Sequence, residues 1–163
     1  MNAITLLEAE HKHMRKLLDE LESTTERGVK TRTELFATIK GELSIHEVIE
    51  EEIFYPALKS HPKAKDIVLE GYEEHHVVDL LMGEVESLDV SDETWGAKAT
   101  VMKENIEHHI EEEEGEMFKQ ARAVFDRQEL EDLGARMEQR KREALADPGE
   151  IEAEREERAE PDR

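Results

Sequence analysis

Apolar residues recur in steps of three and four along four long stretches of the chain, the spacing that places side chains on one face of a helix. The pattern predicts helices over residues 3–25, 32–55, 65–88 and 92–122, and a shorter helix over residues 127–145. Glycine and proline are sparse and cluster between these stretches. The sequence therefore predicts an all-α, antiparallel up-down four-helix bundle with a short fifth helix.

Local signals suggest where these helices begin and end. Pro56 is expected to end the second helix, and the "SDET" that starts at Ser91 offers caps for the fourth. The "DRQE" from Asp126 fits a capping box for the fifth. Residues 146–163 are charged and contain one large apolar side chain. They predict a disordered acidic tail, which leaves residues 1–145 as the folded domain.

The core-facing face of each long helix is apolar except at one level, where a histidine interrupts it. The interrupting side chains are His11 in the first helix, His46 and Glu50 in the second, His75 in the third, and His109 and Glu113 in the fourth. An isolated charge is costly to bury, so two glutamates at core positions require a common partner. A histidine and a glutamate four residues apart are neighbours on a helix and can reach the same ion.

Two segments repeat the same pattern: "HEVIEEEIFYP" from His46 and "HIEEEEGEMFK" from His109. The spacing from His46 to His109 is 63 residues, and from His11 to His75 it is 64, as a duplicated helix hairpin would give. Two such hairpins would bring all six side chains to one layer. Imidazole and carboxylate ligands suit iron or manganese, and zinc less specifically, and bridging carboxylates favour two ions over one. The alternative is a hydrogen-bonded polar layer without metal.

The third predicted helix supplies only one core histidine, which leaves a gap in the ligand set. Glu47 is the first candidate to fill it, and Asp79, four residues after His75, is a weaker one. Tyr55 is read as a core residue, or else as a hydrogen-bond donor near the site. The neighbouring glutamates are assigned to a solvated face, and they are Glu51, Glu52, Glu111, Glu112 and Glu114.

Composition excludes several functions. The chain of 163 residues has no cysteine, which excludes disulfides, thiol catalysis and zinc–thiolate sites. Its formal charge of −21 comes from 43 acidic against 22 basic residues, and such a surface repels nucleic acid and anionic membranes. No stretch reads as a signal peptide or a membrane span, so the cytoplasm is the expected location.

Four segments in order, "EAEHKHMRKLL", "IHEVIEEEIFYPAL", "EEHHVVDLL" and "HHIEEEEGEMFKQAR", resemble the hemerythrin-like, HHE cation-binding family over residues 3 to about 122. The resemblance implies a four-helix bundle that holds a non-haem di-iron centre with an oxygen-derived bridge. Manganese or zinc are the less expected occupants. The implied ligands are His11, His46, Glu50, His75, His109 and Glu113, and the two glutamates would bridge the irons.

The sequence departs from the oxygen-carrying members of that family at the third helix. Those proteins have a second histidine there, in an H-x-x-x-H pair, where this chain has Gly71. This argues against simple reversible oxygen carriage. Some HHE members fill the gap with a glutamate directly after the second-helix histidine, which corresponds to Glu47.

The resemblance implies a centre that meets dioxygen, peroxide or nitric oxide, in binding, sensing or stress response. One alternative is a di-iron oxidase or peroxide-consuming enzyme. Another is an iron-buffering or iron-sensing module without turnover. No pocket for an organic substrate and no nucleotide motif is visible in the sequence, which favours a binding protein over an enzyme. The sequence names no protein partner.

Overall fold

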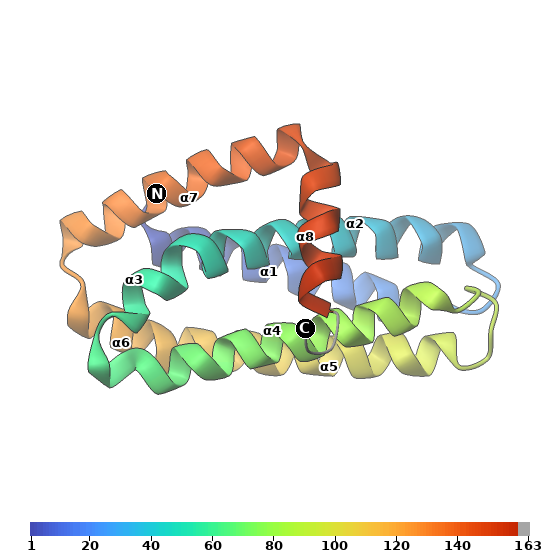
Figure 1. Ribbon diagram of the computed structural model, residues 1–163. Coiled ribbons are helices and arrows are strands. Elements are labelled where there is room, and N and C mark those ends of the chain that lie inside the picture. The colour runs from blue at the N-terminus through green and yellow to red at the C-terminus, as the bar shows by residue number, and fades with distance from the viewer. Residues whose placement is uncertain (160–163) are drawn as a thin grey trace.

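The computed structural model describes residues 1–159, and all regular structure in that range is helical, as predicted (Figure 1). The long helices are α1 (Ala3–Glu22), α2 (Val29–Ile49), α4 (Lys65–Ser87), α5 (Trp95–Glu112) and α7 (Arg127–Ala146). Helices α1, α2, α4 and α5 lie side by side as a bundle, in which α1 pairs with α2 and α4 pairs with α5. Each half of the bundle is thus one helix hairpin.

Side-chain caps fix several helix ends. Asn2 accepts a hydrogen bond from the backbone N–H of Thr5 at 2.9 Å, and the capping box of Asp126 and Glu129 at the start of α7 is present as predicted. Helix α5 begins at Trp95, later than expected. The reason is that Asp89 and Asp92 accept hydrogen bonds from backbone N–H groups two residues further on, which holds residues 89–94 in turns.

The second helix does not end at Pro56, contrary to the prediction. Helix α2 continues through a π-helical turn, η1 (Glu50–Phe54), into α3 (Tyr55–Lys59), and the short 3₁₀ turn η2 (Pro62–Ala64) follows. The wider turn places Pro56 in the first turn of α3, where proline is tolerated. Pro56 has no backbone N–H, so it cannot donate the π-helical hydrogen bond to the carbonyl oxygen of Glu51, five residues earlier. The hydroxyl of Tyr72 donates to that oxygen instead, at 3.3 Å.

The fourth helix contains the same irregularity at the equivalent place. Helix α5 continues through a second π-helical turn, η3 (Glu113–Met117), into α6 (Phe118–Val124). Both π-helical turns begin at a glutamate that the sequence places in the polar layer, Glu50 and Glu113. Single π-helical turns inside α-helices occur frequently at functional sites.

The apolar core forms two clusters, one on each side of the polar layer. One cluster contains Leu7, Phe54, Tyr55 and Phe118 and is rich in aromatic rings. The other consists mainly of aliphatic side chains and methionines, with Phe36 and Trp95 at its far end. The layer of histidines and glutamates therefore lies inside the bundle, between two hydrophobic regions.

Residues 148–159 form helix α8 (Pro148–Ala159), so the prediction of a disordered tail is wrong for this segment; residues 160–163 lie outside the described range. Helix α8 turns away from the direction of α7 and lies across α2 and α4 (Figure 1). Its one large apolar side chain, Ile151, packs with Ile45 and Val48 on a second apolar face of α2. The sequence analysis considered only the core-facing side of α2 and missed this contact. No helix within residues 1–159 is long and apolar enough to cross a membrane.

Gly134 allows α7 to lie directly on the N-terminus of α1. A Cβ atom at this position would clash with the carbonyl oxygen of Met1 and lie 2.8 Å from the carbonyl carbon of Asn2, and both are backbone atoms. We expect Gly134→Ala to lower the free energy of unfolding by ~1–3 kcal/mol, the usual cost of overpacking. Urea denaturation measures the change.

Gly83 in α4 provides the matched control, because a Cβ atom there meets nothing within 4 Å. Gly83→Ala should leave stability unchanged or raise it by up to ~1 kcal/mol, the difference in helix propensity. Equal effects of the two substitutions would show that α7 does not pack on α1 as described.

Candidate metal centre

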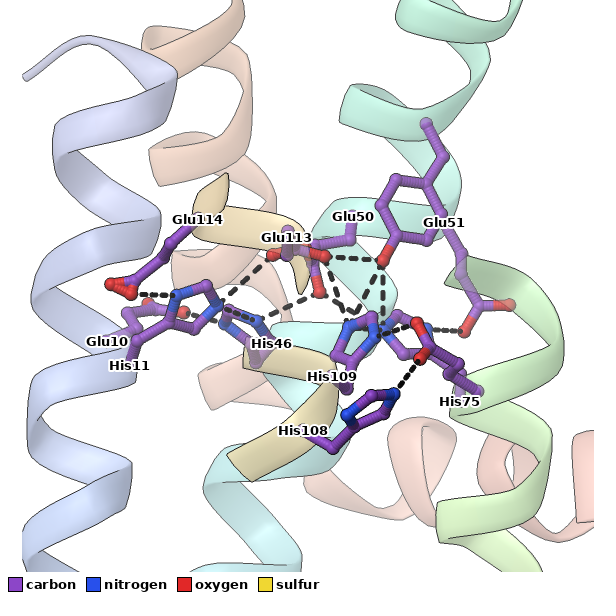
Figure 2. Close-up of polar contacts among 12 residues, drawn as sticks. Glu10, His11, His46, Glu50, Glu51, His75, His108, His109, Glu113 and Glu114 are labelled. Atoms are coloured by element: carbon purple, nitrogen blue, oxygen red, sulfur yellow. Dashed lines mark hydrogen bonds and ion pairs between the residues drawn. The ribbon is translucent and has the colours of Figure 1, made fainter. Parts of the chain in front are cut away.

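Six buried side chains from the four bundle helices converge on one layer, the six that the sequence singled out (Figure 2). Their ligand atoms form two groups, each within 4.8 Å and each able to hold a metal ion. One group is His11, His46, Glu50 and Glu113, and the other is Glu50, His75, His109 and Glu113. Each group has two histidines of its own, and both groups share the same two glutamates.

In the first group the Nε2 atoms of His11 and His46 lie 3.2 Å apart. The Nε2 atom of His46 lies 2.9 Å from Oε1 of Glu50, and that of His11 lies 3.1 Å from Oε1 of Glu113. The histidines come from α1 and α2, so the first hairpin supplies both.

The second group repeats this arrangement with α4 and α5. The Nε2 atoms of His75 and His109 lie 3.1 Å apart. Nε2 of His75 lies 3.2 Å from Oε1 of Glu50, and Nε2 of His109 lies 3.1 Å from Oε2 of Glu113. Each glutamate thus faces one histidine of each hairpin.

A ring of outer carboxylates holds the opposite side of the histidine rings. The Nδ1 atoms of three histidines lie at hydrogen-bond distance from a carboxylate: His46 to Glu10 at 2.8 Å, His75 to Glu51 at 3.0 Å, and His109 to Glu74 at 2.9 Å. Nδ1 of His11 lies 3.5 Å from Glu114. Such carboxylates fix the tautomer and the orientation of metal-ligating histidines and raise their basicity.

These outer carboxylates were missed: Glu51 and Glu114 were assigned to a solvated face, and Glu10 and Glu74 were not singled out. The duplication carries a signal that could have found them. Glu10 and Glu74 are 64 residues apart, and Glu51 and Glu114 are 63 apart, the same spacings as the core histidines. A glutamate is thus duplicated beside His11 and His75 and beside Glu50 and Glu113, which indicates a shared role for these neighbours.

The donor atoms fit a cation between them. A neutral imidazole that donates from Nδ1 presents a lone pair at Nε2. Three of the four histidines have an Nδ1 partner of this kind, and the four Nε2 atoms face one another in two pairs. Among the described residues, both oxygens of Glu50 and Oε1 of Glu113 accept no hydrogen bond although they are buried. Acceptors that converge without donors repel one another, and a positive ion at the middle of each group removes that repulsion.

Without metal, protons supply part of this charge. Burial lowers the pKa of His109, but Glu113 and Glu74 more than offset it and raise the pKa to about 9. Burial acts in the same way on His46, whose pKa Glu50 and Glu10 raise well above its usual value. Burial raises the pKa of Glu113, yet the neighbouring Glu50, His109 and His11 hold it well below the usual range. Metal ions must therefore displace protons from these histidines.

Tyr55 occupies the space that the missing third-helix histidine would need. Its hydroxyl donates to Oε2 of Glu113 at 2.6 Å and lies 3.3 Å from Nε2 of His75 and 3.4 Å from Nε2 of His109. A Cβ atom on Gly71 would lie 3.0 Å from this hydroxyl, so the glycine makes room for the ring. Burial and the nearby carboxylates raise the pKa of Tyr55 well above its usual value, which keeps the hydroxyl protonated as a donor.

The gap-filling candidates belong to neither of the two four-residue groups. Glu47 is buried and gathers with Glu51 and His75 in a third, smaller group. Asp79 is also buried and belongs to none of these groups. A role for Glu47 as a ligand stays a prediction.

The raised histidine pKa predicts how the stability of the metal-free protein depends on pH. His109 has a higher pKa when folded, about 9, than its ordinary value of 6.5. Its protonation therefore stabilises the fold fully below pH 6.5, and this contribution is lost as the pH rises through about 9. Urea unfolding of chelator-treated protein at pH 6, 8 and 10 should show a falling free energy of unfolding. His109→Asn should flatten that fall, and an equal slope in the variant would contradict the assignment.

The chain is similar to known proteins in sequence and in fold. The hemerythrin HHE cation binding domain family matches residues 2–121. A search of curated proteins found no match. A crystal structure of a hemerythrin HHE cation binding domain-containing protein from Mycobacterium kansasii is similar, with a TM-score of 0.76 and 28% sequence identity over 90% of this chain and 91% of that one. The matched residues contain all four helices that carry the histidines and glutamates of the layer, and the chain belongs to the hemerythrin HHE cation-binding family.

Proposed function

We propose that the protein is a non-haem di-iron protein whose His/Glu centre interacts with dioxygen or a related small ligand, peroxide or nitric oxide. One observation carries the proposal: two groups of potential ligands share both of their glutamates, Glu50 and Glu113. Two separate mononuclear sites have no need to share carboxylates, whereas a metal pair does. Histidine and carboxylate donors together suit iron, with manganese or zinc as less favoured occupants.

In this proposal His11 and His46 would hold one ion, His75 and His109 would hold the other, and Glu50 and Glu113 would serve both. A reduced iron pair, when bound, supplies electrons and an open position for a small ligand. The chain itself orients the histidine rings and supplies the negative charge of the carboxylates. Glu10, Glu51 and Glu74 keep the Nε2 atoms directed inward through the Nδ1 contacts.

Tyr55 and its neighbours are proposed to control one side of the centre. The Tyr55 ring stacks on His75 with centroids 5.3 Å apart, and Phe118, at the duplicated position, stacks on His11 at 6.0 Å. These rings exclude water from that side of the layer. The only difference between the two rings is the hydroxyl, so Tyr55 makes the two halves of the centre chemically unequal.

That hydroxyl also favours a second candidate function, a peroxide-consuming enzyme. A protonated phenol within 3.4 Å of two histidine Nε2 atoms can turn its hydrogen bond from Glu113 to a ligand at the centre. Reversible oxygen carriage is less favoured, because Gly71 and Tyr55 replace the histidine that oxygen carriers have there.

The proposal predicts a direct reaction of the reduced, iron-loaded protein. Anaerobic protein mixed with dioxygen, hydrogen peroxide or nitric oxide should change its near-ultraviolet and visible spectrum in proportion to protein concentration. Stopped-flow absorption measures the change. Catalytic loss of peroxide beyond one equivalent per iron pair would select the enzyme over the binding protein.

Paired variants test the shared glutamates. Glu113→Ala should lose the spectral response and reduce bound iron below two per chain, because both groups use this side chain. Glu111→Ala removes an exposed carboxylate from the same helix and should behave like the unaltered protein. An unchanged iron content in Glu113→Ala would show that the glutamate does not bridge.

A further inference from the structure

A hollow of about 460 Å³ lies beside the layer, on the side opposite Tyr55. Its walls combine side chains of the layer, among them His11, His46, His75 and His109, with aliphatic side chains. The aliphatic walls are Met14, Leu43, Val78, Ile106 and Ile110. The hollow is therefore continuous with the candidate metal centre.

The size of the hollow exceeds what the small ligands need. Its volume corresponds to that of roughly fifteen water molecules in the liquid, at ~30 Å³ each, while dioxygen and peroxide contain two heavy atoms. It falls within the range of about 300–1,000 Å³ typical of sites for organic ligands.

The hollow is confined to one side of the layer. On the other side Tyr55, Phe54 and Phe118 fill the core with fully buried aromatic rings. Protein interiors pack closely, and unfilled volume in a core lowers stability. Larger side chains at Val78 or Ile106 would close the hollow, yet the chain has aliphatic side chains of moderate size there. This asymmetry indicates a space kept for an occupant.

The hollow reaches the surface where α7 passes α1 and α2. His13, Glu42 and Leu145 line this end and are exposed, whereas His75 and Val78 at the inner end are buried. The charges at the outer end are already paired: Lys141 with Glu10 at 2.6 Å, and His13 with Glu42 at 2.9 Å. A ligand would therefore find its polar partner at the layer, not at the mouth.

The carboxylates in the hollow select the head group. Glu47 lines it together with the histidines, next to the buried Glu50 and Glu113 of the layer, and these carboxylates disfavour an anion. A neutral oxygen atom can approach the layer without this repulsion.

We propose that the hollow binds a small neutral aliphatic molecule with one oxygen-bearing head group, of the class of medium-chain alcohols and alkyl hydroperoxides. The head group lies at the layer and the chain lies against Met14, Leu43, Val78, Ile106 and Ile110. The position of the head group rests on the proposed metal centre, whereas the chain site depends only on the walls of the hollow.

Straight-chain 1-alkanols from ethanol to 1-octanol test the proposal on the iron-loaded protein by calorimetry. Each added methylene should tighten binding about fourfold, which corresponds to ~0.8 kcal/mol per buried methylene, until the chain reaches the mouth. Affinity that does not change with chain length overturns the proposal.

Neighbouring substitutions in α4 localise the chain. Val78→Phe fills the hollow and should abolish the dependence on chain length, with Ile106→Phe as a second variant if the first does not fold. Val77→Phe places the same ring on the exposed face, where 43% of Val77 is accessible, and should keep the dependence. Equal behaviour of the Val78 and Val77 variants would contradict the assignment.

Metal binding and alcohol affinity are measured separately, so this proposal and the proposed function can fail independently. If the protein binds no metal pair and its affinity for alcohols still rises with chain length, the ligand site in the hollow is supported and the proposed di-iron centre is contradicted. If the protein binds a metal pair and its affinity for alcohols is independent of chain length, the di-iron centre is supported and the ligand site in the hollow is contradicted.

Discussion

Two carboxylates, Glu50 and Glu113, lie fully inside a hydrophobic bundle, and the rest of the site follows from the charge they bring there. A buried carboxylate destabilises a fold unless positive charge compensates it. Four imidazoles face the two glutamates at 2.9–3.2 Å, so protons or metal ions can supply that charge. The outer carboxylates in turn hold the imidazoles. The arrangement is stable as a whole, and removal of any one member leaves an uncompensated charge in the core.

The residues of this layer could be predicted because helical periodicity leaves few explanations for a polar side chain on a core face. His11 and His75 interrupt apolar faces, and the glutamates follow the other two histidines by one helical turn. The duplication added a second, independent constraint, since equal spacings in two hairpins bring the same level of each to the middle of the bundle. Neither argument depends on the exact ends of a helix, and several of those ends differ from the prediction.

Features that depend on contacts between helices could not be read in the same way. The π-helical turns shift the register after Glu50, which places Pro56 inside a continuing helix and turns Tyr55 toward Glu113. Tyr55 can occupy its position only because Gly71 on a different helix leaves room. Helix α8 packs Ile151 on a second face of α2, and its buried Arg155 pairs with Glu86 of α4, whereas local composition alone favours disorder there. In each case the deciding partner is distant in the sequence.

The central claim is that Glu50 and Glu113 are shared by two metal ions. The most direct test is the metal content of protein purified in air without added metal, measured together with its near-ultraviolet and visible spectrum. The account predicts two irons per chain and the ligand-to-metal bands of a bridged diferric pair. A single zinc per chain, or no metal with the helical fold intact, would contradict it and would leave the His/Glu layer as a structural feature of the bundle.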